Sequence, residues 1–110
     1  MAGELRMTQI KKYVIRHKPT GYFIPVPHDK SKRPKNTTRG GTFYEPMPDP
    51  HLIRLFVSEL SAKRFLTAWL MGKHIGQNDD GYSYVAQIKP ISSRIRSEME
   101  ILPAYMEIQI

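Results

Sequence analysis

Apolar side chains recur at helical spacing in one segment of this chain, residues 58–71. Five of them stand at positions i, i+3, i+4, i+7 and i+8 of a single stripe: Ala62, Phe65, Leu66, Trp69 and Leu70. Ser58 is a favourable N-cap, Glu59 faces the positive end of the helix dipole, and Gly72 stands where a helix ends. The pattern predicts one principal amphipathic helix that buries this stripe in the core.

A β-hairpin is predicted before this helix. Residues 13–17 and 22–26 are rich in β-branched and aromatic types, and they flank the turn sequence Lys18-Pro19-Thr20-Gly21. Pro19 fixes φ at the second turn position, and Gly21 can adopt a positive φ, as a type I turn with a G1 bulge requires. Pro25 and Pro27 cannot donate to a ladder, so the second strand should end early or lie at a sheet edge.

Further strands are expected around and after the helix. Residues 52–57 are interpreted as a strand leading into the helix, with Val57 and Ala62 forming a hydrophobic staple. Residues 77–81 read as a polar turn and 82–88 alternate as a strand does, while 99–110 form a closing strand broken by Pro103. The predicted fold is α+β: an N-terminal β-hairpin and one principal amphipathic helix packed on an antiparallel sheet that C-terminal strands complete.

The length of 110 residues suits one domain. We interpret residues 1–10 as a flexible leader and 11–110 as a single α+β domain. Within that domain, residues 28–41 lack a large apolar side chain and carry five bases and one acid, which predicts a basic loop.

Several classes of chemistry lack support in the sequence. The absence of cysteine excludes a disulfide framework, thiolate metal sites and a cysteine nucleophile. The four histidines do not share a spacing that places two of them on one face, so we expect neither a metal nor a cofactor, and no catalytic residue is assigned. No apolar run is long enough to span a membrane or to act as a signal peptide, so a cytosolic protein is expected.

The excess of positive charge is concentrated in the first half of the chain. The net charge is +7, with +6 in residues 1–50 and +1 in residues 51–110. Bases are interleaved there with aromatic residues, a combination that can neutralise phosphates and stack on unpaired bases. The candidate binding residues for nucleic acid or an acidic partner are Lys11, Lys12, Arg16, Lys18, Lys30, Lys32, Arg33, Lys35 and Arg39. The neighbouring aromatics Tyr13, Tyr22 and Phe23 are equally consistent with stacking platforms and with sheet core.

The order of several short motifs resembles that of small uncharacterised proteins encoded by tailed bacteriophages and prophages. The motifs are the run from Tyr13 to Pro25, Gly41-Thr42 with Glu45-Pro46, the helix with Arg54-Leu55-Phe56 before it, and Met99-Glu100-Ile101-Leu102-Pro103. The likeness covers most of residues 12–103, and the chain departs from it by a longer basic loop and extra residues after Pro103. The resemblance implies a phage origin and the cytoplasm of an infected bacterium, but it implies no activity.

Binding is therefore favoured over catalysis. The first hypothesis is a phage-encoded accessory factor that contacts DNA or RNA through the basic hairpin and loop. The second is a stoichiometric inhibitor of a host protein complex, which would offer a basic face or an exposed strand to an acidic host protein. A minor structural or assembly protein of the virion is a third possibility. None of the three involves a membrane or a small-molecule cofactor.

Overall fold

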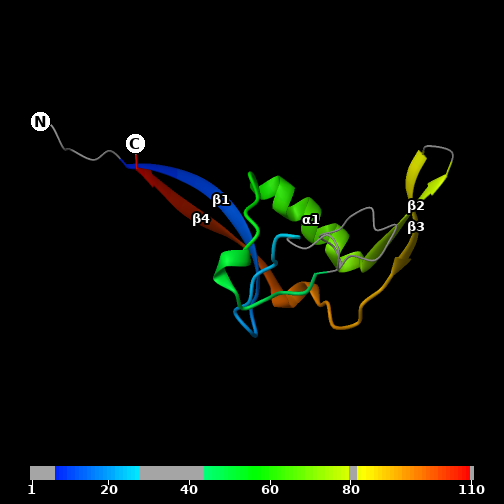
Figure 1. Ribbon diagram of the computed structural model, residues 1–110. Coiled ribbons are helices and arrows are strands. Elements are labelled where there is room, and N and C mark those ends of the chain that lie inside the picture. Colours follow the sequence, from blue (N-terminus) through cyan, green and yellow to red (C-terminus); the bar gives the residue numbers. More distant parts are fainter. Residues whose placement is uncertain (1–6, 28–43, 80–81, 110) are drawn as a thin grey trace, which may run out of the picture.

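The computed structural model describes residues 7–27, 44–79 and 82–109. Its fold is α+β, with one main helix packed against an antiparallel pair of strands (Figure 1). This pair consists of β1 (Met7–His17) and β4 (Met99–Gln109), and the helix is α1 (Glu59–Met71). A second two-stranded sheet is formed by β2 (Lys73–Asp79) and β3 (Tyr82–Lys89).

The central pairing joins segments from opposite parts of the sequence. β1 and β4 are antiparallel from Met7 opposite Gln109 to His17 opposite Met99, without a register shift. The predicted leader is therefore wrong for residues 7–10, which lie in β1 and pair with 106–109. Residues 1–6 of that leader, and the predicted loop 28–41, lie outside the described residues.

The turn that follows β1 has the predicted form. Gly21 has a φ of 75°, and its N–H donates to the carbonyl of His17 at 2.8 Å. The N–H of His17 in turn donates to the carbonyl of Tyr22 at 2.7 Å, which closes the turn. The returning segment is not a regular strand, however, because its pairing is limited to isolated bridges, which include Arg16 with Phe23. The continuous partner of β1 is β4, so the predicted two-stranded hairpin is only a bulged turn with a short return.

The segment before α1 also differs from the prediction. Residues 52–57 do not form a strand: a 3₁₀ helix covers Pro50–Leu52, and isolated bridges join Ile53 to Pro25 and Phe56 to Tyr13. The side chain of Asp49 accepts a hydrogen bond from the N–H of His51 and caps this short helix. The partner of Ile53 is Pro25, which has no N–H to donate, so pairing here is reduced to single contacts.

Pro103 does not break the closing strand, because its nitrogen points to the side of β4 that faces away from β1. Tyr13, its partner in β1, exchanges two backbone hydrogen bonds with Phe56, of 2.9 and 2.8 Å, on the side of β1 away from β4. Hydrogen bonding alternates along an antiparallel pair, so Tyr13 and Pro103 form a pair without hydrogen bonds between them. The nitrogen of Pro103 therefore faces the outer edge of β4, where the missing N–H leaves no gap in the ladder.

Helix α1 begins at the predicted cap. The Ser58 hydroxyl accepts from the N–H of Ser61, and the Ser61 hydroxyl accepts from the N–H of Ser58, which completes a capping box. The predicted hydrophobic staple is wrong, because Val57 is 72% exposed whereas Ala62 is fully buried.

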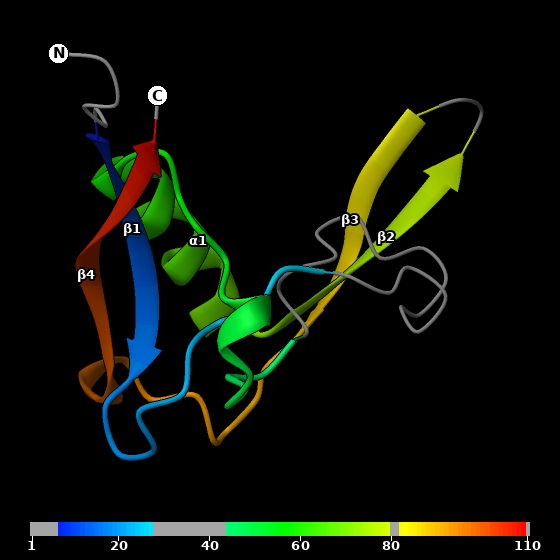
Figure 2. The same cartoon turned by 60° about the vertical axis from the view of Figure 1, so that its left-hand side comes forward.

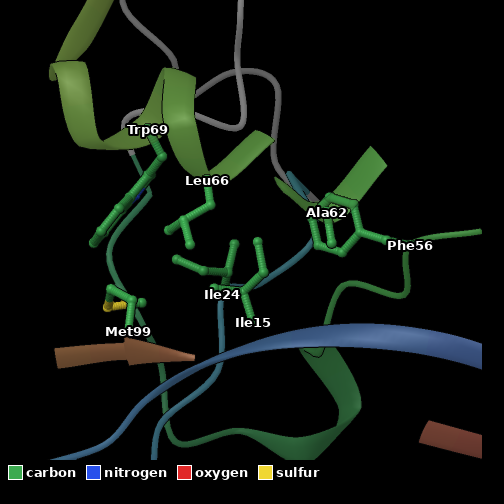
Figure 3. Close-up of a cluster of buried hydrophobic side chains, with 7 residues drawn as sticks. All are labelled: Ile15, Ile24, Phe56, Ala62, Leu66, Trp69 and Met99. Atoms are coloured by element: carbon green, nitrogen blue, oxygen red, sulfur yellow. The ribbon is translucent and has the colours of Figure 1, made fainter. Parts of the chain in front are cut away.

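The predicted stripe of α1 faces the core. Ala62, Leu66 and Trp69 are buried, and Phe65 and Leu70 pack against them from the margin. Figure 3 shows Ala62, Leu66 and Trp69 of the helix facing the side chains that complete the cluster. These are Ile15 of β1, Ile24 of the returning segment, Phe56 of the segment before α1, and Met99 of β4. One face of the β1–β4 sheet is thus closed by α1, as the amphipathic pattern predicts.

The β2–β3 sheet extends away from the rest of the fold (Figure 2). β3 has the predicted position, but residues 77–79, which we expected in a turn, belong to β2. Gly72 links α1 to β2 with a φ of 116°, and a Cβ there would lie 2.0 Å from the carbonyl oxygen of Lys89. Glycine is required at this junction because the end of β3 passes directly against its backbone.

Candidate nucleic-acid interface

The two adjacent lysines of β1 lie on opposite faces of the strand. Successive strand side chains alternate between faces, which places Lys11 on the face of Tyr13 and Ile15 and places Lys12 on the other face. The ammonium of Lys11 is 5.4 Å from the centroid of the Tyr13 ring. A hydrogen bond to Tyr13 raises the pKa of Lys11, so this exposed group stays positively charged. The two cations therefore flank the strand instead of forming one patch.

Arg16 is engaged within the fold. Its Nη1 donates to Glu100 Oε1 at 2.8 Å, and the two residues are partners in the β1–β4 register. The guanidinium also packs against the turn, because a Cβ at Gly21 would lie 3.4 Å from Nη2. Arg16, one of the four described candidates, thus has its charge balanced by a carboxylate. It also links the turn to β4.

Lys18 stands in the turn with an exposed side chain. Its backbone N–H donates to the carbonyl of Glu98 at 2.8 Å, which fixes the turn against the start of β4. Lys11, Lys12 and Lys18 form no ion pair with any residue that the structure describes. The other five candidates, namely Lys30, Lys32, Arg33, Lys35 and Arg39, lie outside the described residues. The described chain resumes at Tyr44, whose carbonyl accepts from Trp69 Nε1 at 2.9 Å.

A buried arginine is the main feature that sequence reasoning missed. The side chain of Arg94 is 0% exposed. Its Nε donates to Glu45 Oε1 at 2.9 Å and its Nη1 to the carbonyl of Trp69 at 2.7 Å, while the guanidinium lies 4.2 Å from the Trp69 ring centroid. Burial lowers the pKa of Arg94, and the hydrogen bond to Glu45 opposes this effect. The partners of Arg94 are remote in the sequence, so no local pattern indicates that this arginine is buried.

A second arginine is held by aromatic rings. The guanidinium of Arg54 lies 4.9 Å from the ring centroid of Phe56 and 4.6 Å from that of Phe65. Burial lowers the pKa of Arg54 as well. This cation covers the edge of the core between the segment before α1 and the helix itself, which supports a packing role.

A hollow of about 200 Å³ lies between the turn after β1 and the C-terminal half of α1. Its lining combines aromatic, imidazole, hydroxyl and carboxylate groups: His17, Thr20, Tyr22, Glu45, Trp69 and Ser93. We refer to it as the turn hollow.

A hydroxyl, an imidazole and a carboxylate follow one another beside this hollow. The Thr20 hydroxyl is 2.7 Å from His17 Nδ1, and His17 Nε2 is 3.9 Å from Glu98 Oε1. The second distance exceeds a hydrogen bond, and the Thr20 hydroxyl already accepts from the N–H of Tyr22 at 3.2 Å. The geometry favours a role in stabilising the turn over nucleophilic catalysis.

The part of the chain that the structure describes contains no group of three acidic or histidine side chains arranged to hold a metal ion. Among the same residues, no helix is both long enough and apolar enough to cross a membrane. Comparisons with protein-family models, curated proteins and solved structures give no match to this chain.

Proposed function

We propose that this protein is a non-enzymatic, nucleic-acid-binding accessory factor of a bacteriophage that acts in the cytoplasm of the infected cell. The observation that carries the proposal is the distribution of ion pairs. Three of the five described glutamates, Glu45, Glu59 and Glu100, are each paired with a lysine or an arginine, at 2.8, 3.2 and 2.8 Å respectively. The lysines of β1 and its turn have no such partner among the described residues, so their charge is available to phosphates.

The position of these lysines adds to the argument. Lys11, Lys12 and Lys18 follow one strand and its turn, with Lys11 and Lys12 on opposite faces, so β1 offers cations to phosphates on both of its faces. The basic segment 28–41 begins shortly after this turn in the sequence and adds five further cations. Such contacts give affinity without reading the sequence of bases.

Neutralising the basic segment should weaken binding and leave the fold intact. Replacing Lys30, Lys32, Arg33, Lys35 and Arg39 with glutamine lowers the net charge from +7 to +2. Each phosphate contact that is lost should reduce the slope of log K against log salt by about 0.7 to 0.9. The measurement is a fluorescence titration with single- and double-stranded oligonucleotides at three salt concentrations. If the unmutated protein shows no saturable binding even at about 50 mM salt, the nucleic-acid proposal is wrong.

The described lysines allow a test with a matched control. We expect the variant Lys11→Gln/Lys12→Gln/Lys18→Gln to bind more weakly on all sequences alike. The control Arg64→Gln/Lys89→Gln/Arg96→Gln removes the same charge from exposed positions on α1, on β3 and before β4. Equal losses of affinity in the two variants would show that only the net charge matters and that β1 forms no interface.

A second candidate function is supported by the open edge of β4. Among the described residues, β4 pairs with β1 only, so its outer edge has no partner strand. Tyr105, Met106 and Ile108 in its distal half are 60%, 39% and 41% exposed. An extended segment of a host protein could add to this edge as a further strand, which is how an inhibitor would bind.

A pull-down from infected-cell lysate, with and without nuclease, separates the two functions. Recovery of partners that is lost after nuclease treatment supports the nucleic-acid proposal. One host protein that is retained in stoichiometric amount after nuclease treatment supports the inhibitor. In that case salt sensitivity should be shallower, because binding depends on one acidic surface of the partner and on backbone hydrogen bonds.

A further inference from the structure

The turn hollow has the size of a site for one small planar group. Its volume of about 200 Å³ is below the roughly 300–1,000 Å³ that is usual for sites of drug-sized ligands. Its aromatic lining comes from Tyr22, which is 39% exposed, and from Trp69, which is 2% exposed. Trp69 is held by its Nε1 bond to Tyr44 and by the stacked Arg94, so this wall of the hollow is rigid. Tyr22 is the aromatic side chain with accessible surface for stacking.

The polar lining is able to recognise an amino group. Glu45 Oε1 accepts from Arg94, whereas Oε2 receives no hydrogen bond from the residues that the structure describes. The carboxylate is half exposed and lines the hollow. A carboxylate accepts hydrogen bonds from the exocyclic amino group of cytosine, and adenine and guanine carry such a group too. Thymine and uracil offer no amino group to this oxygen.

The surroundings of the hollow suit a nucleotide. Lys18 is exposed and directly follows His17 of the lining in the sequence, so its cation is the candidate partner for the phosphate of the bound residue. A base that is paired and stacked in a duplex does not fit a hollow of this size, whereas an unpaired base can be splayed out and inserted.

We propose that the turn hollow binds one unpaired nucleobase with an exocyclic amino group, stacked on Tyr22 and hydrogen-bonded to Glu45. This inference rests on the proposed function and specifies the form of nucleic acid that is preferred, which is single-stranded and rich in cytosine, adenine or guanine. The same chemistry would accept a free nucleotide.

The test is fluorescence anisotropy with labelled single-stranded oligonucleotides of one base each, oligo(dC) and oligo(dT), at three salt concentrations. We expect oligo(dC) to bind more tightly than oligo(dT). Tyr22→Ala should lower the affinity for oligo(dC) about fivefold to 150-fold, because stacking on one aromatic side chain is worth about 1–3 kcal/mol per base. It should not change the salt slope, since it removes no charge.

The control is Leu60→Ala. Leu60 is a 56% exposed residue on α1 that does not line the hollow, so its variant should bind as the unmutated protein does. A second variant, Ser93→Tyr, fills the hollow from an exposed turn position and should remove the preference for oligo(dC) without removing the Tyr22 ring. If Tyr22→Ala fails to fold, Ser93→Tyr still tests whether the hollow binds a base.

The outcomes separate this inference from the proposed function. Salt-dependent binding with equal affinity for the two oligonucleotides, unchanged in Tyr22→Ala and Ser93→Tyr, overturns the base site and leaves the proposed function standing. Absence of binding to every oligonucleotide overturns both. If cytidine monophosphate displaces oligo(dC) and Tyr22→Ala abolishes this displacement, the base site is supported and the free nucleotide is a second source of the ligand. If Tyr22→Ala does not fold, Ser93→Tyr is used for the same comparison.

Discussion

Replacing Trp69 with alanine should lower the free energy of unfolding by about 3–5 kcal/mol, because removing a large buried aromatic leaves a cavity that the core fills only in part. Trp69 is 2% exposed and belongs to the core cluster between α1 and the sheet. The substitution also leaves the carbonyl of Tyr44 without the indole donor and removes the ring on which Arg94 lies. The loss should therefore fall in the upper part of this range.

Chemical denaturation followed by far-ultraviolet circular dichroism measures this loss. Fluorescence is unsuitable, because Trp69 is the single tryptophan of the chain. The control is Lys63→Ala on the same helix, where a 62% exposed side chain forms an i,i+4 pair with Glu59 at 3.2 Å. Such a change should cost no more than about 0.5 kcal/mol. Comparable losses in the two variants would show that the buried face of α1 is assigned incorrectly.

Removing the buried arginine should have the second largest effect. Arg94→Ala breaks a charged contact to Glu45, a hydrogen bond to the end of α1 and the stack on Trp69. Removing one partner of a buried pair typically costs about 3–5 kcal/mol. Because Glu45 is 49% exposed, water can solvate its freed carboxylate. We therefore expect a loss of about 3 kcal/mol, at the lower end of that range.

Arg96→Ala is the matched control, since this arginine lies two residues further on and is exposed. It should stay within about 0.5 kcal/mol of the unmutated protein. A double-mutant cycle of Arg94→Ala with Glu45→Ala then isolates the direct interaction, for which we expect a coupling of at least about 0.5 kcal/mol. An Arg94→Ala variant as stable as Arg96→Ala would contradict the buried network.

The parts of the fold that sequence reasoning recovers are those set by neighbours in the chain. The cap at Ser58 and the stripe of α1 are local patterns, and so is the demand for a positive φ at Gly21. β2 was missed because residues 77–79, Gln-Asn-Asp, are typical of turns, and pairing with β3 overrides that preference. Pro103 was expected to interrupt its strand because the side on which its nitrogen lies depends on the register.

The candidate site divides in the same way. The excess of basic residues in the first half is evident from composition. The charge of Arg16 is balanced by Glu100, while Lys18 has no partner among the described residues. This difference depends on the β1–β4 register, which the sequence does not specify locally. The network of Arg94 joins three segments and had no local signal. The turn hollow likewise arises only where the turn, Glu45 and Trp69 meet.

The pairing of β1 with β4 has a consequence for how the chain folds during synthesis. Met7 pairs with Gln109 and His17 with Met99, so every contact of this sheet spans more than 80 residues of sequence. At about 5–20 residues per second, β1 is synthesised roughly five to twenty seconds before the most distant part of its partner. During that interval Val14 and Ile15, which are buried in the finished protein, are without the strand that pairs with them. The nascent chain thus carries an unpaired apolar strand until translation reaches β4, and the sheet forms as one of the last steps.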